Sequence, residues 1–498
     1  MLFAFKSTNA NSNIVPIEKR LRLFNPFPGC YDNLKKIIED LDRIALMGFR
    51  QIWINPFYKP CQKNPLTPHK FNCPYAMQDH TSLNPEYGDD LGVVAEFTRR
   101  AAKLGLVPLF DLVARHIAID HPIVAGDVEL IKHGIDTTKW FKRHPNGNFV
   151  IKGLDADYKP TEADPWSDVV EFNYDDPLIL KQIFEYFWKP FIVYNIQKLG
   201  FMGARLDVVW QIPRAALELL LPFIQETCLK THQREAYLVA ETLAITQEGI
   251  ENIKGLVTHT MNSVYWMPGP EGRNEHTYNL WLDDNNWYEL SKKSLQQAGP
   301  SAGFAGSHDE QRYTQFLEER AIKDPVIQKQ RMLESMMVAA FSSDGGHIVC
   351  FGDEYGIKDR ISLVQKRPIR VLQERQFDLT TEIAAINKIV ASLPIDSQER
   401  TQRVMYAQHP SLVIFIVHQE TRGETLLIIG NSYDEGNRIV VDQNMLSEIM
   451  NANGRNKELP ESRVRLFACG NVSFAPEIDY EKMHAPTRSQ SPQVCTYG

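Results

Sequence analysis

The feature that most constrains the fold is a helical segment followed by a short apolar strand, a pair that recurs along the chain. Apolar side chains recur at helical spacing in residues 34–44, Asp32 can cap that helix, and RQIWINP follows it as a strand. The same order returns in residues 89–113, 177–209 and 214–243, and later copies end in AGFAGSHD and HIVCFGDE. Near-continuous apolar strands are typical of parallel sheets, so this alternation predicts consecutive βα units.

Acidic side chains stand at the ends of several of these strands. Six or more βα units favour a closed (β/α)8 TIM barrel over an open sheet, and barrel enzymes carry their chemistry at the C-terminal ends of the strands. Those ends hold Asp111, Asp207, Glu241 and Asp309. The fold alone does not require four acids at one level, so the pattern predicts an active site there.

The spacing of the units changes once, after the third strand. The interval from Asp111 to Asp207 is about three times the length that one βα unit of such a barrel uses. We therefore expect a catalytic barrel formed by residues 1–116 and 173–395, interrupted by a lobe at 117–172. Aromatic side chains that can form a core for this lobe are Trp140, Phe141, Phe149 and Trp166.

Beyond about residue 395 the hydrophobic period changes from helical to alternating. Segments such as SLVIFIVHQ and ETLLIIGNSY are separated by Gly, Asn and Pro turns. This pattern predicts a C-terminal antiparallel β-sandwich domain over residues 396–480. Residues 481–498 are polar, with little apolar content, and are expected to form a tail.

Composition and charge exclude several classes of protein. The chain has 54 Lys+Arg against 62 Asp+Glu, a net charge of −8, and we find no dense basic stripe, so no nucleic-acid partner is expected. No stretch reaches the ~20 apolar residues of a membrane span, and no secretory core precedes the first helix. The seven Cys include no CxxC pair, which favours reduced thiols. We expect a cytoplasmic protein, or one exported without a conventional signal peptide; the oligomeric state is left open.

Several short motifs follow the predicted strands in a fixed order. They are DLVARH (111–116), GARLD (203–207), VAET (239–242) and FAGSHD (304–309), supported by YAMQD (75–79), NPEYGD (84–89) and FGDEYG (351–356). In this order and context the chain resembles the α-amylase family of retaining glycosidases, glycoside hydrolase family 13. The resemblance covers the barrel, the lobe and the β domain.

The resemblance implies roles for three acids. Asp207 would be the nucleophile, Glu241 the acid/base, and Asp309 a third carboxylate that binds sugar hydroxyls and stabilises the transition state. Retaining cleavage uses two carboxyl groups about 5–5.5 Å apart. Clustered acids repel one another's ionisation, which suits a Glu241 that keeps its proton. Arg205 lies on the same face of its strand as Asp207 and can hold that carboxylate ionised.

Further residues are implied to bind substrate. They are Tyr75, Asp79, His116, Arg205, Trp210 and His308. Tyr75 matches a tyrosine that stacks under the reacting sugar, and His116 and His308 match hydroxyl-binding histidines. A lone Tyr or His near a strand end is usually a packing residue, but positions inside the motifs favour binding. Asp111 is mainly architectural in the family.

The chain departs from the family pattern at three places. The first motif usually ends in Asn-His, and that Asn binds a structural Ca²⁺; here Arg115 stands there, and a guanidinium cannot ligate a cation. We therefore predict no calcium site, no other metal and no cofactor, with the arginine charge in place of the ion. Trp210 and Gln211 replace the usual Lys-His, and Trp210 could either stack on a sugar or pack in the barrel. Ser307 replaces an Asn.

The leading hypothesis is hydrolysis of α-1,4-glucosidic bonds in glycogen, starch-type glucans or maltodextrins, with exo-release of glucose or maltose as one product pattern. The rival is glycosyl transfer on the same fold, as in glucanotransferases and maltosyltransferases. A non-catalytic carbohydrate-binding relative would be expected to lack one of the acids. Because this chain keeps all three, that third hypothesis is disfavoured.

Overall fold

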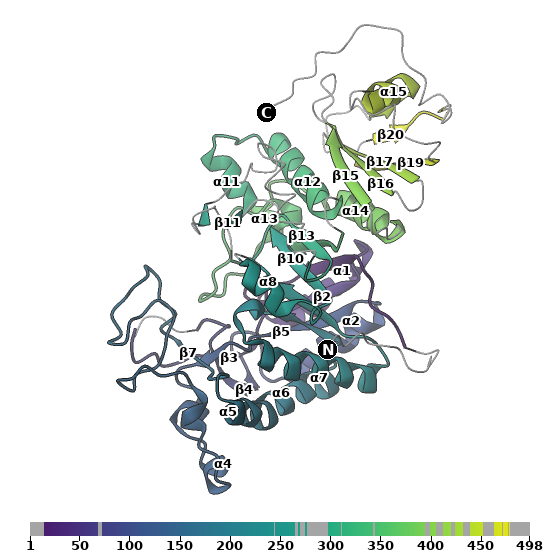
Figure 1. Ribbon diagram of the computed structural model, residues 1–498. Coiled ribbons are helices and arrows are strands. Elements are labelled where there is room, and N and C mark those ends of the chain that lie inside the picture. Colours follow the sequence, from purple (N-terminus) through teal and green to yellow (C-terminus); the bar gives the residue numbers. More distant parts are fainter. Residues whose placement is uncertain are drawn as a thin grey trace.

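The largest part of the molecule is a closed barrel of eight parallel strands (Figure 1). The computed structural model describes residues 14–67, 72–243, 245–263, 267–268, 274–275, 297–309, 311–341, 344–393, 399–404, 412–419, 424–431, 439–451, 463–470, 472–476 and 478. The barrel strands are β1 (Leu21–Asn25), β2 (Gln51–Trp53), β5 (Val107–Leu112), β8 (Gly203–Leu206), β9 (Tyr237–Glu241), β10 (His259–Ser263), β13 (Ser301–Phe304) and β14 (Gly346–Cys350). Because β1 pairs in parallel with both β2 and β14, the sheet closes on itself, and the predicted TIM barrel is confirmed.

Helices surround the barrel and cover its outer face (Figure 1). They are α1 (Leu34–Leu46), α2 (Gly92–Lys103), α5 (Pro177–Ile183), α6 (Lys189–Val193), α7 (Arg214–His232), α8 (Gln247–Ile253), α11 (Tyr313–Glu319), α12 (Pro325–Phe341), α13 (Val371–Glu374) and α14 (Thr380–Ser392). Two π-helical turns, η3 (Phe184–Trp188) and η4 (Tyr194–Lys198), flank α6. Short 3₁₀ turns are η1 (Pro28–Cys30), η5 (Val209–Gln211) and η6 (Asp353–Tyr355).

The start of α1 differs from the expectation. Asn33, not Asp32, caps this helix, because its extended backbone lets its side-chain oxygen accept a hydrogen bond from the Lys36 N–H at 3.2 Å. The Asp32 carboxylate instead forms a two-point ion pair with Arg370, at 2.8 and 2.9 Å. Asp32 therefore joins the first βα unit to the segment that follows the last barrel strand.

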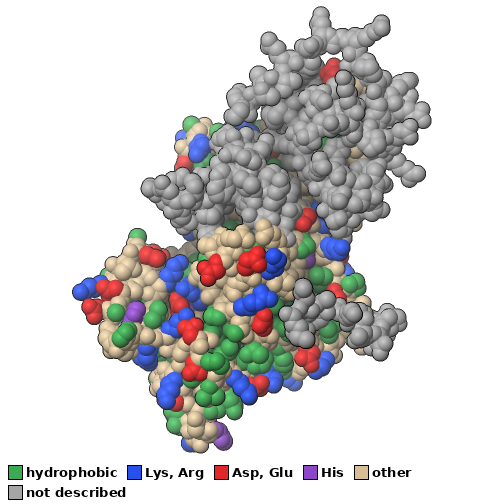
Figure 2. Space-filling model, viewed as in Figure 1, with side chains coloured by type: hydrophobic (Ala, Val, Ile, Leu, Met, Phe, Trp, Pro, Cys, Tyr) green, Lys and Arg blue, Asp and Glu red, His purple; other side chains and the backbone are tan. Residues whose placement is uncertain are grey.

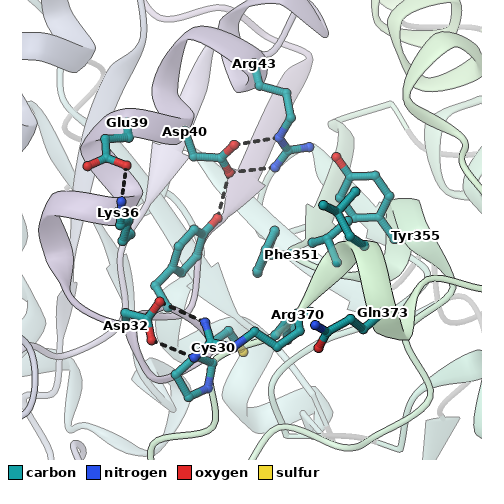
Figure 3. A pocket seen from close by; sticks show the side chains of 15 residues that line it. Cys30, Asp32, Lys36, Glu39, Asp40, Arg43, Phe351, Tyr355, Arg370 and Gln373 are labelled. Atoms are coloured by element: carbon teal, nitrogen blue, oxygen red, sulfur yellow. Dashed lines mark hydrogen bonds and ion pairs between the residues drawn. The ribbon is translucent and has the colours of Figure 1, made fainter.

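A surface pocket of about 540 Å³ marks this junction between α1 and α13 (Figure 3). Its charged groups pair with one another: Asp32 with Arg370, Lys36 with Glu39, and Asp40 with Arg43. Behind them the Tyr31 ring stacks on the Phe351 ring at 4.4 Å. None of the three predicted catalytic acids lines the pocket, so it is not the predicted active site.

The segment inserted after the third barrel strand forms a lobe whose buried aromatic side chains are continuous with the main hydrophobic core of the barrel, so the separate lobe core expected from the sequence is not found. The strands β6 (His116–Ala118) and β7 (Val169–Glu171) pair antiparallel where the chain leaves and re-enters the barrel. Between them lie α3 (Pro122–Ala125), α4 (Val128–Lys132) and the 3₁₀ turn η2 (Thr137–Trp140). Trp140 and Phe141 are buried in the lobe. Beside the lobe, β3 (Tyr58–Pro60) and β4 (Met77–Leu83) form an antiparallel pair whose β4 strand contacts β6.

The C-terminal region contains sheet structure where it was expected, but two of its strand pairs, β17 with β19 and β18 with β20, are parallel rather than antiparallel. Its strands are β15 (Glu399–Val404), β16 (Val413–Gln419), β17 (Glu424–Asn431) and β19 (Arg463–Gly470), and a second pair consists of β18 (Ile439–Val441) and β20 (Val472–Phe474). The first three strands pair antiparallel, whereas β17 and β19 pair in parallel. Parallel neighbours need a crossover, and α15 (Gln443–Asn451) lies in it, with Leu446 and Ile449 buried at helical spacing.

The C-terminal sheet packs on α12 and α14 (Figure 1), and β11 (Met267–Pro268) and β12 (Asn274–Glu275) form a short antiparallel pair. The predicted tail at 481–498 lies outside the described residues. In the part of the chain that is described, no helix is long and apolar enough to cross a membrane. On the face shown in Figure 2, acidic and basic side chains are interspersed.

Candidate active site

The barrel brings the predicted acids to one end of its strands. Asp111 lies in β5, Asp207 directly follows β8, Glu241 ends β9, and Asp309 lies in the loop after β13. Asp111 is level with Arg205 of the neighbouring strand. Because side chains alternate along a strand, Arg205 and Asp207 point to the same face.

Arg205 lies at the centre of the site and contacts three carboxylates. Its Nη1 lies 2.7 Å from Asp207 Oδ1 and 3.0 Å from Asp111 Oδ1, and its Nη2 lies 2.8 Å from Glu241 Oε2. The side chain is only 2 % exposed, so these ion pairs are shielded from water. Because the terminal nitrogens of one planar guanidinium contact both Asp207 and Glu241, these two carboxyl groups lie close to each other at the same end of the barrel.

Two residues that the sequence did not single out support this centre. The Trp53 Nε1–H donates to Asp111 Oδ2 at 3.1 Å, and the Trp53 ring lies 4.8 Å below the Arg205 guanidinium. Asn55 donates from its side-chain amide to the Tyr75 hydroxyl at 2.9 Å, and that hydroxyl donates to Asp111 Oδ2 at 3.0 Å. Both residues stand at or just past the end of β2, so the strand-end criterion would have found them had it included neutral polar and aromatic side chains.

The backbone after Asp207 is unusual. Val208 has φ 39° and ψ 37°, a left-handed conformation that is rare for a β-branched residue. Its N–H donates a hydrogen bond to Glu241 Oε2 at 2.8 Å. The strained backbone therefore links the residue next to Asp207 directly to the Glu241 carboxylate, and it fixes the two acids relative to each other.

Burial raises the pKa of the central acids. It is the largest cause of a pKa of about 7 for both Asp207 and Glu241, and Arg205 opposes the shift in each case. The pKa of Asp111 is raised to about 6, again mainly by burial. The sequence argument expected mutual repulsion to favour a proton on Glu241. In the structure desolvation is the larger cause and acts on both acids, so Asp207 and Glu241 share the tendency to keep a proton.

Asp309 and His308 join the cluster from the other side of Tyr75. His308 Nε2 lies 2.7 Å from the Tyr75 hydroxyl and 3.2 Å from Asp309 Oδ2, and the two rings stack at 5.5 Å. Burial lowers the pKa of His308 to about 4, so its ring is neutral near pH 7. Arg360 donates a hydrogen bond to the backbone carbonyl of Asp309. Asp309 is 37 % exposed and is the most accessible of the three acids.

The other predicted substrate-binding residues divide into two groups. His116 lies next to the cluster, with Nε2 3.2 Å from the Tyr75 carbonyl oxygen. Asp79 does not join it: its oxygens accept hydrogen bonds from the Thr81 and Ser82 hydroxyls within β4, both at 2.6 Å.

The position of Trp210 favours a packing role over stacking on a sugar. It lies in η5 and packs against α8. A Cβ placed on Gly249 of that helix would meet the Trp210 ring at 3.1 Å. A side chain held this closely against a neighbouring helix is expected to contribute to packing.

A model of the alpha-amylase catalytic domain matches residues 4–409, which is most of the chain. The chain belongs to the alpha-amylase family. It is thus a glycoside hydrolase of that family, and the resemblance read from its motifs is confirmed. No curated protein matches the sequence.

Solved structures show the same fold at low sequence identity. A trehalose-6-phosphate hydrolase from Bacillus licheniformis has a TM-score of 0.60 and 15% identity, covering 83% of this chain and 90% of that one. An alpha-amylase from Lactobacillus plantarum has a TM-score of 0.57 and 18% identity, covering 82% and 88%. A maltogenic alpha-amylase from Thermotoga neapolitana has a TM-score of 0.57 and 18% identity, covering 83% and 86%.

The raised pKa values make the acids of this alpha-amylase family member costly to the folded state at neutral pH. A carboxyl group whose pKa is higher when folded gives its full stability below its unfolded pKa and loses it as the pH rises through the folded value. Asp207→Asn or Glu241→Gln should therefore increase the free energy of unfolding at pH 8 by about 1–3 kcal/mol. Thermal unfolding near pH 4 should show almost no such gain. Destabilisation at pH 8 would contradict the burial argument.

Proposed function

We propose that this chain hydrolyses α-1,4-glucosidic bonds of glycogen, starch-type glucans or maltodextrins with retention of configuration. In the first step the Asp207 carboxylate bonds to the anomeric carbon while protonated Glu241 gives its proton to the departing glycosidic oxygen. In the second step ionised Glu241 takes a proton from water, the water oxygen attacks the anomeric carbon, and the bond to Asp207 breaks. Asp309 is assigned to hydroxyl binding in both steps.

The observation that carries this proposal is the position of Arg205. Its guanidinium contacts Asp207 and Glu241 at once, at 2.7 and 2.8 Å. Retaining enzymes hold their two carboxyl groups about 5–5.5 Å apart, closer than inverting enzymes, which need room for a water between them. Two carboxylates that both contact one guanidinium fit the closer spacing of a retaining enzyme. The substrate class is proposed from the family membership.

The pairing with Arg205 also assigns a state to each acid. Since both acids have a pKa of about 7, the pair readily holds one proton near neutral pH. A proton on Glu241 leaves Asp207 ionised and held by Arg205, which is the state that the first step needs. After the sugar bonds to Asp207 that carboxylate charge disappears, and Arg205 then favours the ionised Glu241 that activates water.

Hydrolysis and glycosyl transfer share the first step and differ in the acceptor of the sugar. Incubation of pure maltoheptaose with the enzyme should produce a steady increase in reducing ends, with glucose or maltose among the chromatographically separated products. The Asp207→Asn variant prepared in the same way is the control for contaminating activity. Redistribution of chain lengths at a constant number of reducing ends would instead assign the chain to the transferases.

A further inference from the structure

The neck of the lobe contains a cluster of charged and aromatic side chains outside the acid site. Arg115 immediately precedes β6, and its Nη2 lies 2.5 Å from Glu171 Oε1 of β7. The Arg115 guanidinium lies 5.4 Å from the centre of the Trp166 ring, and the Lys152 ammonium lies 4.0 Å from the same centre. The His116 ring meets Trp166 edge-on at 5.6 Å. The Trp166 ring thus contacts Arg115, Lys152 and His116.

The residues of this neck do not fit the calcium ion that the family resemblance would place here. Ca²⁺ takes 6–8 oxygen ligands, whereas the guanidinium of Arg115 offers only N–H donors. Glu171, the nearby carboxylate, is already paired with Arg115, and both side chains are largely buried at 14 % and 16 % exposure. In the described ranges, no group of three or more His, Cys, Asp or Glu side chains could hold a metal.

We infer that Arg115 is a positioning residue that fastens the lobe to the barrel and holds His116 against the acid site without a divalent cation. The Glu171 carboxylate and the Trp166 ring hold the Arg115 guanidinium in place, and the backbone carbonyl of Arg115 accepts a hydrogen bond from the Phe172 N–H at 3.1 Å. The ion pair therefore joins the two chain segments that connect lobe and barrel.

A continuous set of contacts leads from this cluster to the acids. Trp166 supports the His116 ring, and His116 Nε2 contacts the Tyr75 carbonyl. The Tyr75 hydroxyl in turn donates to Asp111, which pairs with Arg205. Loss of the Arg115 side chain is expected to shift Trp166 first and His116 with it. Because a misplacement of about 1 Å can cost ~10²-fold in rate, the effect should reach catalysis.

Arginine suits this position better than lysine. Its planar guanidinium can bond to a carboxylate and stack on an aromatic face at once, whereas an ammonium is a compact point charge. Burial lowers the pKa of His116 to about 3, and the positive charges of Arg115 and Lys152 contribute to this shift. The imidazole is therefore neutral near pH 7, and its buried Nδ1 has no hydrogen-bond partner among the residues that the structure describes.

The test compares Arg115→Ala and Arg115→Lys with a matched control, Arg143→Ala. Arg143 is also in the lobe and lies 4.0 Å over the Phe149 ring, but no contact joins it to His116 among the described residues. We expect Arg115→Ala to lose about 10- to 100-fold in kcat/KM on maltoheptaose at a temperature where it is folded. Arg115→Lys should recover little of this loss, and Arg143→Ala should stay within about twofold of the parent.

Two measurements separate positioning from a general structural role. Millimolar methylguanidinium should restore part of the kcat/KM of Arg115→Ala, whereas CaCl₂ should not. Thermal unfolding, which needs no substrate, should show that EDTA leaves the parent unchanged and that methylguanidinium stabilises only Arg115→Ala. The kinetic readout rests on the proposed function, so an inactive parent enzyme would refute that function while the unfolding measurements still decide the inference. Loss of parent stability in EDTA with recovery in Ca²⁺, or equal losses in the Arg115 and Arg143 variants, would overturn it.

Discussion

Replacement of Asp207 by Asn is expected to lower kcat on maltoheptaose by at least about 10⁴-fold, the scale seen when a nucleophile is removed. An amide oxygen is a poor nucleophile, and the first step then has no group to bond to the anomeric carbon. The carboxamide keeps the size of the side chain and can still accept a hydrogen bond from Arg205, so the cluster should stay assembled. Loss of activity should therefore occur in a protein that is more stable at pH 8 than its parent.

The pairing of these two results is what makes the substitution informative. A variant that lost activity because it unfolded would show a lower melting temperature. As a matched control, Asp79→Asn changes another predicted site acid whose hydrogen bonds are local to β4. We expect that control to keep its kcat within about tenfold, because surface changes away from the acids have small effects. Asp207→Asn with near-parental activity would refute the assignment of the nucleophile.

Replacement of Glu241 by Gln is expected to slow glucan cleavage by about 10²–10⁴-fold, the usual contribution of a general acid. Release of fluoride from α-maltosyl fluoride should fall far less in the first turnover, because fluoride leaves without needing a proton. The second step still lacks its base, so steady-state turnover should recover when azide is added as an anionic acceptor. Burst and steady-state measurements with a fluoride electrode check both points.

The contrast with Asp207→Asn separates the two roles. Removal of the nucleophile should abolish turnover of glucan and fluoride alike, whereas removal of the acid should discriminate between them. Equal losses on both substrates in Glu241→Gln, without recovery in azide, would show that Glu241 does not act as the acid/base.

Much of the fold could be predicted because helix and strand periods alternate so regularly. The apolar runs before Asp111, Asp207 and Glu241 each became a barrel strand, since only a strand buried on both faces needs such a run. The sequence indicates Asp32 as the cap of α1, whereas the structure has Asn33, because both residue types cap helices and only tertiary contacts decide between them. The parallel pairing of β17 with β19 depends on a crossover, which strand periodicity does not encode.

Charged residues of the site could be predicted from the sequence. Residues that hold those charged groups in position were harder to predict. The acids and Arg205 stand in motifs, and the structure brings Asp111, Asp207, Glu241 and Arg205 into contact. Trp53 looked like one more apolar strand residue, although its indole N–H bonds to an acid. The left-handed backbone of Val208 has no sequence signal at all, because valine normally avoids that conformation.

A covalent bond between substrate and Asp207 is tested most directly by mass spectrometry of Glu241→Gln incubated with α-maltosyl fluoride. Fluoride departs without acid assistance, and the missing base slows release of the sugar, so the glycosyl-enzyme should accumulate. Peptide mapping should then place a mass increase of one maltosyl group on the peptide that contains Asp207. Fluoride release with no adduct, or an adduct on a different peptide, would contradict retaining catalysis through Asp207.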